Sequence, residues 1–199
     1  TKLLSIGTLG LKKNRKLVPT RWSITAVDSN LSEEKIGKIR YFPEISEYRV
    51  FHDEYLGNHY EILLMPRHWS FEVIEAKVGV GKFWQDYEIN FSRKKYANDV
   101  TGAYYSNRLA VCEFLDKIKK QAGVVFLREI RNYDIPLGVG ILREVSRNAF
   151  KKGARKFNSL KEAFEDIQSR IMTPISNYVD RSKVIEEYKK QTSLRSFIR

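Results

Sequence analysis

The chain has 199 residues, of which 42% are hydrophobic and 13% aromatic, a composition that supports a folded interior and excludes general disorder. Its 36 Lys and Arg residues outnumber its 24 Asp and Glu residues, and the net charge of +12 indicates a polyanionic partner such as a nucleic acid. Its longest apolar runs, at 62–65 and 124–127, are too short to span a membrane, so we expect no membrane partner.

The first half of the chain predicts β-strands. The predicted strand segments are rich in β-branched and aromatic side chains, and several alternate apolar and polar residues. They lie at 21–28, 48–56, 59–66, 69–81 and 83–91, and turn residues end them. Strands that follow one another at such short intervals favour an antiparallel sheet.

The second half predicts mainly helices. Apolar residues recur at helical spacing within 104–123, and a short helix is expected at 138–153. A further helix at 158–171 opens with Ser159 and Glu162 at the spacing of a capping box. One strand, at 124–131, interrupts these helices.

The predicted fold class is therefore α+β, with a largely antiparallel sheet in the first half and helices mainly in the second. Pro174 ends the last strong helical pattern, so we expect a core domain at 1–173 and a short, charged, loosely attached tail at 174–199. Because the chain begins with Thr1 and not Met, we expect it to be the latter part of a longer protein.

One pattern among the strands suggests a metal-dependent nuclease. Glu75 and Lys77 are two residues apart, which on a strand directs a carboxylate for Mg²⁺ and an ammonium for phosphate to one face. Asp53 or Glu61 would supply the second metal ligand, with Gln85 nearby. The same spacing recurs twice elsewhere in the chain and so arises easily by chance. The sequence leaves open whether the protein is an enzyme.

Other metal-binding and nucleophilic patterns are weaker. His52, His59 and His68 are separated by seven and nine residues, which matches no zinc spacing. Cys112 is the single cysteine and falls on the apolar face of a predicted helix, where a buried thiol in a reducing compartment is expected. We expect no metal bound by these residues.

A concentration of positive charge at 143–161 predicts contact with nucleic acid phosphates. The alternative is a solvated charged face with Phe150 and Phe157 packed in the core. The candidate DNA-binding residues are Arg143, Arg147, Lys151, Lys152, Arg155, Lys156 and Lys161.

The last residues of the chain form a second candidate site. Gln191, Leu194 and Phe197 are spaced by three, so their side chains align in a 3₁₀ turn, and Ile198 adds an apolar neighbour. This pattern resembles the peptide that binds the sliding clamp PCNA, with Ile198 where a second aromatic residue is usual. The alternative is that the tail folds back and buries Leu194 and Phe197 within the domain.

The stretch Arg-Lys-Leu-Val-Pro-Thr-Arg-Trp-Ser-Ile-Thr-Ala-Val-Asp at 15–28 resembles a signature of the archaeal Nre family of DNA repair proteins. The resemblance implies a role in the repair of damaged DNA through PCNA, in the cytoplasm of an archaeal cell and close to its nucleoid. Family members also carry a four-cysteine, zinc-binding element near the N-terminus. This chain has one cysteine, so we expect no zinc in it, and Mg²⁺ only if the nuclease alternative holds.

Three functions follow as hypotheses. The first is a DNA-binding repair factor recruited to the clamp, the second is a metal-dependent nuclease of the same pathway, and the third is a clamp adaptor without DNA contact. The oligomeric state is left open by the sequence.

Overall fold

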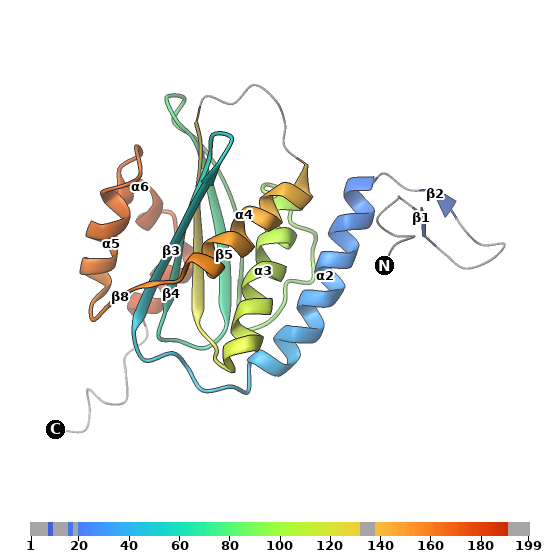
Figure 1. The fold of residues 1–199 in the computed structure, drawn as a ribbon, viewed down its shortest axis with the longest axis horizontal. Helices are drawn as coiled ribbons and strands as arrows, with labels where there is room; N and C mark the ends of the chain where they lie inside the picture. Colours follow the sequence, from blue (N-terminus) through green and yellow to red (C-terminus); the bar gives the residue numbers. More distant parts are fainter. Residues whose placement is uncertain (1–7, 10–15, 18–19, 132–137, 191–199) are drawn as a thin grey trace.

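A computed structural model of the chain describes residues 8–9, 16–17, 20–131 and 138–190. Its centre is a six-stranded sheet with the order β6-β5-β7-β4-β3-β8, and helices lie against both faces of this sheet (Figure 1). The neighbouring strands are antiparallel except β5 and β7, which run parallel. The predicted α+β class with a largely antiparallel sheet is confirmed.

The strands of the central sheet lie close to the predicted positions. β3 and β4 are joined by a two-residue turn in which Leu56 and Gly57 have φ values of 46° and 71°. Positive φ at both positions is typical of a tight hairpin turn whose twist matches that of the strands. The strands are β3 (Tyr48–Tyr55), β4 (Asn58–Met65), β5 (Ser70–Lys77), β6 (Lys82–Ile89), β7 (Gly123–Ile130) and β8 (Arg155–Phe157). A separate two-stranded pair is formed by β1 (Thr8–Leu9) and β2 (Lys16–Leu17).

Three helices form a layer on one face of the sheet: α2 (Thr20–Ile39), α3 (Gly102–Ile118) and α4 (Val139–Lys152). The core between them and the sheet contains Phe71, Val73 and Phe126 from the strands, with Tyr104 and Leu115 from α3. The first turns of α3 and α4 approach so closely that a Cβ atom at position 102 would lie 2.6 Å from a methyl carbon of Val139. Glycine at 102 therefore permits the contact.

The strand predicted at 21–28 is wrong, because these residues belong to the 20-residue helix α2. The buried positions of α2 include Ser23, Asp28, Ser32, Ile36 and Ile39, which recur at helical spacing. Three of the five are polar, so the buried face of this helix does not read as an apolar stripe. The β-branched residues Ile24, Thr25 and Val27 then favoured a strand in the sequence analysis.

Three shorter helices cover the other face of the sheet: α5 (Leu160–Gln168), α6 (Ile175–Val179) and α7 (Lys183–Lys190). The predicted capping box at the start of α5 is confirmed, since the Ser159 hydroxyl accepts a hydrogen bond from the Glu162 backbone N–H at 3.2 Å.

The expectation of a loosely attached segment after Pro174 does not hold for residues 175–190. Tyr178, Val184 and Ile185 are buried with Leu63, Val125 and other strand residues in a second core, which tethers α6 and α7 to the sheet.

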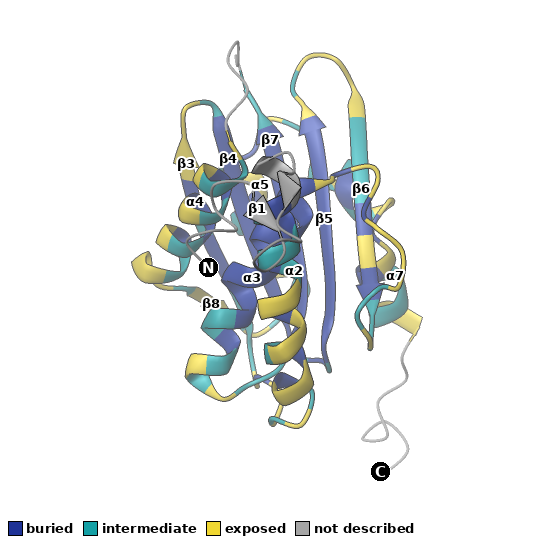
Figure 2. Cartoon of the chain, turned by 90° about the vertical axis from the view of Figure 1, so that its right-hand side faces the viewer, coloured by how far each residue is buried: buried dark blue, intermediate teal, exposed yellow. Residues whose placement is uncertain are grey.

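Two helix layers leave the middle of the sheet inaccessible. β4 is buried along its whole length and β5 along all but its last residue, as the blue strands of Figure 2 show. Functional side chains that touch a ligand must therefore come from the sheet edges, the helix surfaces or the loops at either end. No helix in the part of the chain that the structure describes has both the length and the apolar character to cross a membrane.

Candidate nucleic-acid interface

The basic segment, defined as the seven predicted residues at 143–161, spans three elements. Four of these residues lie on α4, two on β8 and one on α5. α4 covers one face of the sheet and α5 the other, so the segment wraps around the edge of the sheet at β8 (Figure 1). It is a curved rim and not a single flat patch.

The two arginines of the basic segment that lie on α4, Arg143 and Arg147, hold this helix to α2 and α3. Arg143 donates a hydrogen bond to the carboxylate of Asp28, which is fully buried on α2. Arg147 binds Glu113 of α3 through two hydrogen bonds of 2.6 and 2.7 Å, and also Glu144 at 2.6 Å. The hydrogen bonds to Glu113 raise the pKa of Arg147, although its partial burial acts in the opposite direction. Both arginines therefore have structural partners.

Four of the five remaining cations are also ion-paired, but their side chains are more exposed. Lys152 contacts Asp53 at 2.5 Å, Arg155 contacts Asp166 at 2.9 Å, and Lys156 contacts Glu47 at 2.9 Å. Lys161 lies 3.8 Å from Glu165. Of the seven residues of the segment, only Lys151 makes no ion pair with the residues that the structure describes, so most of the positive charge in the segment is already balanced by carboxylates.

A cavity of about 370 Å³ lies beside the basic segment, at the β3 edge. Burial would raise the pKa of Asp53 there, but hydrogen bonds from Lys152, Asn148 and the Glu54 backbone N–H lower it below its ordinary value. His59 has a glutamate at each ring nitrogen, Glu54 at 3.1 Å and Glu61 at 2.8 Å. The cavity is lined by His52, Asp53, Glu54, His59, Arg131, Lys152 and Arg170. Within this lining Lys152 pairs with Asp53 and Arg131 pairs with Glu54.

The structure does not bring the nuclease candidates together. Asp53 lies on β3 and contacts α4, whereas Glu61 on β4 accepts two hydrogen bonds of 2.8 Å from Arg170 on the opposite face of the sheet. Glu75 and Lys77 lie on β5, which is three strand spacings from β3, a separation of about 14 Å. No single metal ion bridges carboxylates so far apart.

Each of these carboxylates also has a cation as its partner. Glu75 accepts a hydrogen bond of 2.5 Å from Arg128, which Asn58 holds on its other side. Burial raises the pKa of Glu75, and the charge of Arg128 opposes that shift. Gln85 binds Glu72 at 2.5 Å and so faces away from Glu75. The described residues contain no cluster of three His, Cys, Asp or Glu side chains suited to a metal.

Cys112 is fully buried, as predicted, and burial raises the pKa of its thiol. His52 lies in the β3-edge cavity, where burial lowers its pKa. His68 lies apart from the other two histidines and contacts Glu44 at 3.2 Å. These residues do not form a shared site.

Sequence reasoning missed a buried ionic network on the face of the sheet that α2, α3 and α4 cover. Arg108 and Glu88 are both fully buried and form a salt bridge of 2.8 Å. Arg108 also donates to the hydroxyls of Ser29 and Ser32 on α2, each at 3.0 Å. The one available signal was the helical recurrence of small polar residues in α2, whose partners are distant in sequence.

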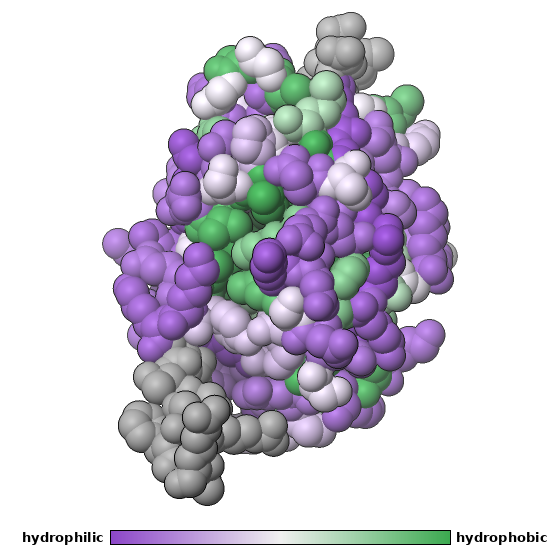
Figure 3. All heavy atoms as spheres, turned by 90° about the vertical axis from the view of Figure 1, so that its left-hand side faces the viewer, coloured by the Kyte–Doolittle hydropathy of each residue, from purple (hydrophilic) through white to green (hydrophobic). Residues whose placement is uncertain are grey.

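The face that carries α5 and α6 has an apolar hollow, seen as the green area of Figure 3. Leu160, Phe164 and Ile175 are among the side chains that line this groove of about 470 Å³. Lys161 and Glu165 lie at its rim, so the groove carries no excess of positive charge.

The predicted clamp peptide, Gln191, Leu194, Phe197 and Ile198, lies outside the residues that the structure describes. It directly follows the last residue of α7 in the sequence.

Comparison with known protein families assigns the chain. Residues 1–84 match the family model "Archaeal Nre, N-terminal" and residues 88–197 match "Archaeal Nre, C-terminal". The chain belongs to the archaeal Nre family. The match includes both models and not a C-terminal portion alone, and the second match extends over most of the predicted clamp peptide.

Three individual relatives are similar along most of the chain. "DNA repair protein NreB" of Archaeoglobus fulgidus is 37% identical over 96% of the chain and 50% of its own length. "DNA repair protein NreA" of the same organism is 37% identical over 98% of the chain and 50% of its own length. "DNA repair protein NreA" of Haloferax volcanii is 34% identical over 83% of the chain and 42% of its own length. The chain thus spans about half the length of these relatives at most. No solved structure matches it.

Proposed function

We propose that this chain is part of a DNA repair protein that binds DNA and is recruited to the sliding clamp PCNA. The observation that carries the proposal is its similarity, along 96% of its length, to a relative named as a DNA repair protein. The net charge of +12 supports contact with a polyanion.

Recruitment to the clamp is assigned to Gln191, Leu194, Phe197 and Ile198. The branched side chain of Leu194 and the ring of Phe197 enter an apolar groove of the clamp, and each contributes about 1.5–3 kcal/mol on burial. Ordering a peptide offsets much of that energy, so we expect a Kd in the micromolar range. Gln191 orients the turn through its amide and contributes less.

DNA contact is assigned in part to the exposed cations of the basic segment. Lys151, Lys152, Arg155, Lys156 and Lys161 are all exposed, so phosphates can reach them. Arg143 and Arg147, which were also predicted to bind DNA, have less accessible side chains and are bound to Asp28, Glu113 and Glu144. We expect these two to act on DNA binding only through stability.

The cellular role is tested by deleting the gene in its native host and measuring survival after exposure to a DNA-crosslinking agent. Deletion should reduce survival, and the full-length gene should restore it. Restoration by a Phe197→Ala gene as complete as by the wild type would contradict clamp recruitment. Unchanged survival of the deletion strain, across agents that produce different lesions, would contradict the repair function.

Clamp binding itself is tested by calorimetry of the 191–199 peptide against PCNA from the same organism. Phe197→Ala should abolish binding, with Thr192→Ala as the control because position 192 lies between the anchoring positions of the pattern. In the whole chain, truncation before Gln191 should abolish clamp binding and leave the unfolding temperature unchanged. A lowered unfolding temperature would show that the tail packs within the domain.

The enzymatic alternative is tested with the whole chain. The protein is incubated with labelled single-stranded, duplex and forked DNA in the presence of Mg²⁺ or Mn²⁺. We expect binding without cleavage. Cleavage that Glu75→Gln abolishes would establish the nuclease alternative, whereas the absence of both binding and cleavage would leave a clamp adaptor.

A further inference from the structure

The layer formed by α2, α3 and α4 presents a surface at the end where α2 and α3 finish. The loop that follows β6 lies at the same end. Two aromatic rings are exposed there: Tyr41, directly after α2, with 86% of its area accessible, and Phe91, after β6, with 63%. The guanidinium of Arg40 lies 4.2 Å from the centre of the Phe91 ring. We call Arg40, Tyr41, Phe91, Lys117 and Lys120 the α2–α3 end surface.

One side chain holds these segments in fixed positions. The Gln121 amide donates to the carbonyls of Arg40, at 3.3 Å, and Phe42, at 2.7 Å. Its oxygen accepts from the Trp69 backbone N–H at 3.0 Å, and the Trp69 carbonyl accepts from the Asn90 N–H at 3.1 Å. The backbones that carry the two rings are therefore linked through a short hydrogen-bonded chain, so the rings are presented on a defined scaffold.

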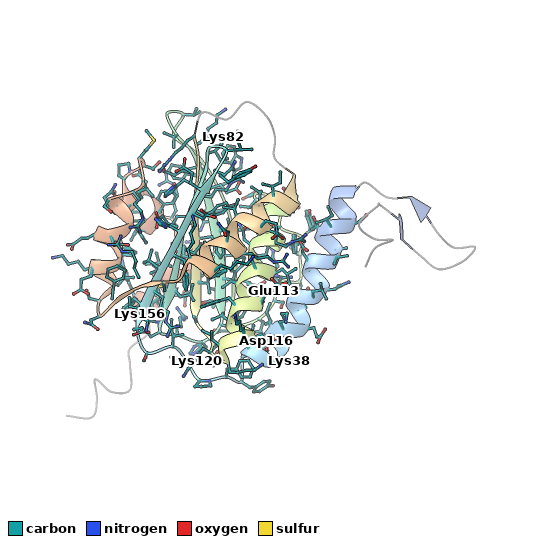
Figure 4. All side chains as sticks on the ribbon, viewed as in Figure 1. Lys38, Lys82, Glu113, Asp116, Lys120 and Lys156 are labelled. Carbon is teal, nitrogen blue, oxygen red and sulfur yellow. The ribbon has the colours of Figure 1, made fainter. Side chains whose placement is uncertain are left out.

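Positive charge at this end exceeds the carboxylates available to balance it. Lys35 and Lys119 share Asp116, at 2.9 and 2.8 Å, and Lys38 pairs with Glu34 at 3.0 Å. Figure 4 shows Lys38, Asp116 and Lys120 grouped at this end of the molecule, away from Lys82 at the other end.

Three cations of the end surface make no ion pair within the part of the chain that the structure describes. They are Arg40, Lys117 and Lys120. Glu44, the other carboxylate nearby, contacts His68 at 3.2 Å. The three cations therefore have no carboxylate that would compete with an external anion, although the Arg40 guanidinium already stacks on the Phe91 ring.

A purely structural explanation accounts for only part of this arrangement. A lysine in the last turn of a helix interacts favourably with its negative end, which explains Lys117 on α3. It does not explain why rings as large as those of Tyr41 and Phe91 are presented to water beside the cations. Exposed aromatic rings interleaved with unpaired cations are the features that proteins use to stack bases and hold the phosphates between them.

We propose that the α2–α3 end surface binds single-stranded DNA, with bases stacked on Tyr41 and Phe91 and phosphates held by Arg40, Lys117 and Lys120. The assignment rests on the proposed DNA repair function and adds to it both a location and a preferred form of DNA. A stacked base pair in a duplex does not offer its face to a protein ring, so this mode of binding requires unpaired bases.

The neighbouring groove gives a strand a continuous path from this surface. Lys117 and Lys151 lie on opposite rims of a groove of about 380 Å³ between α3 and α4, whose lining includes Phe114 and Phe150. Lys151 is the one cation of the basic segment without an ion pair in the described part of the chain. A strand held by Lys120 and Lys117 therefore meets another free cation as it continues.

The test measures the affinity of the whole chain for a fluorescein-labelled oligothymidine of about 20 nucleotides and for a duplex of equal length, which exceed the usual site of about 4–16 nucleotides. The Tyr41→Ala and Phe91→Ala variants should each bind the single strand at least about fivefold more weakly, while Tyr41→Phe should bind as the wild type does. Tyr55→Ala is the control, since Tyr55 is also exposed but lies beside Asp53 and Glu54.

The outcomes separate this site from the broader proposal. Loss of single-strand affinity in both ring variants, with little change for Tyr55→Ala, supports the site. If the wild type binds DNA and both ring variants bind equally well, the surface is wrong although the DNA repair function stands. If the wild type prefers the duplex, the single-strand assignment is wrong. If it binds neither form, the proposed DNA contact is overturned together with the site.

Discussion

The basic segment and the α2–α3 end surface use positive charge in opposite ways. In the segment, six of the seven cations contact carboxylates, several of which come from distant parts of the chain. At the end surface, Arg40, Lys117 and Lys120 have no such partner among the described residues. The denser cluster of Lys and Arg in the sequence is therefore the more neutralised region in the folded protein.

This difference has a thermodynamic consequence for DNA binding. A free cation that binds a phosphate releases a counterion from the DNA, which gives binding its dependence on salt. A paired cation must first exchange its carboxylate for the phosphate, and the like-charged carboxylate stays nearby. Paired cations thus contribute more to the stability of the fold and less to binding.

The largest expected effect comes from breaking a structural pair of the basic segment. Arg143→Ala leaves the buried carboxylate of Asp28 without its cation, which should lower the free energy of unfolding by about 3 kcal/mol. Urea unfolding followed by circular dichroism measures this change. Lys151→Ala on the same helix is the control and should alter stability by less than about 0.5 kcal/mol. Equal losses would mean that the ion pair has no special role.

The same variant has a predicted dependence on pH. Burial raises the pKa of Asp28, and Arg143 opposes this shift, so its removal raises that pKa further. An acid with a raised pKa in the folded state destabilises the fold as pH rises above its unfolded pKa. The deficit of Arg143→Ala should therefore shrink as pH falls from about 7 toward 4. A deficit independent of pH would indicate lost side-chain packing.

A smaller effect should follow from freeing a paired cation. Glu47 contacts both Lys156 and Arg49 at 2.9 Å, and the hydrogen bond from Lys156 is the main reason that its pKa is lowered. Glu47→Gln should convert this part of the basic segment to free charge and increase DNA affinity several-fold at low salt. Fluorescence anisotropy at two salt concentrations measures the gain. Glu187→Gln on α7 is the control, because it removes the same charge outside the basic segment. No gain in Glu47→Gln relative to that control would show that pairing does not limit binding.

The smallest expected effect concerns Asp116, a carboxylate beside the end surface. Hydrogen bonds from Lys119 and Lys35 lower the pKa of Asp116 to about 2. An acid with a lowered pKa contributes stability that is present above its unfolded pKa and is lost as pH falls toward 2. Lys119→Ala should raise the titration midpoint of Asp116 in an NMR experiment and lower stability at neutral pH by less than about 0.5 kcal/mol. An unmoved midpoint would show that Lys119 does not hold this carboxylate.

The fold class followed from local patterns because alternation, turn residues and the capping box act over a few positions. Ser159 and Glu162 predicted the start of α5, and Gly57 the β3–β4 turn. The same local reading failed for α2, because Ser23, Asp28 and Ser32 occupy its buried face. Asp28 and Ser32 bind Arg143 and Arg108, which are remote in the sequence. It also underestimated α7, where only Val184 and Ile185 are buried in a largely charged helix.

The candidate sites were less predictable for a related reason. A sequence shows which residues carry charge but not which opposite charges the fold brings beside them, so Lys152, Arg155 and Lys156 looked free. The end surface is assembled from residues 40–41, 91, 117 and 120, and none of these stretches is unusual in the sequence. Its two exposed rings become a shared feature only when α2, β6 and α3 finish at one end of the sheet.

The most direct test of this account compares the salt dependence of single-stranded DNA binding for two triple variants with equal changes in charge. One replaces Arg40, Lys117 and Lys120 by Ala, and the other replaces Lys152, Arg155 and Lys156. For single strands each phosphate contact adds about 0.7 to the slope of log affinity against log salt. The end-surface variant should lose about 2 from that slope and the basic-segment variant less than about 0.7. The reverse order, with the larger loss in the basic segment, would contradict the account.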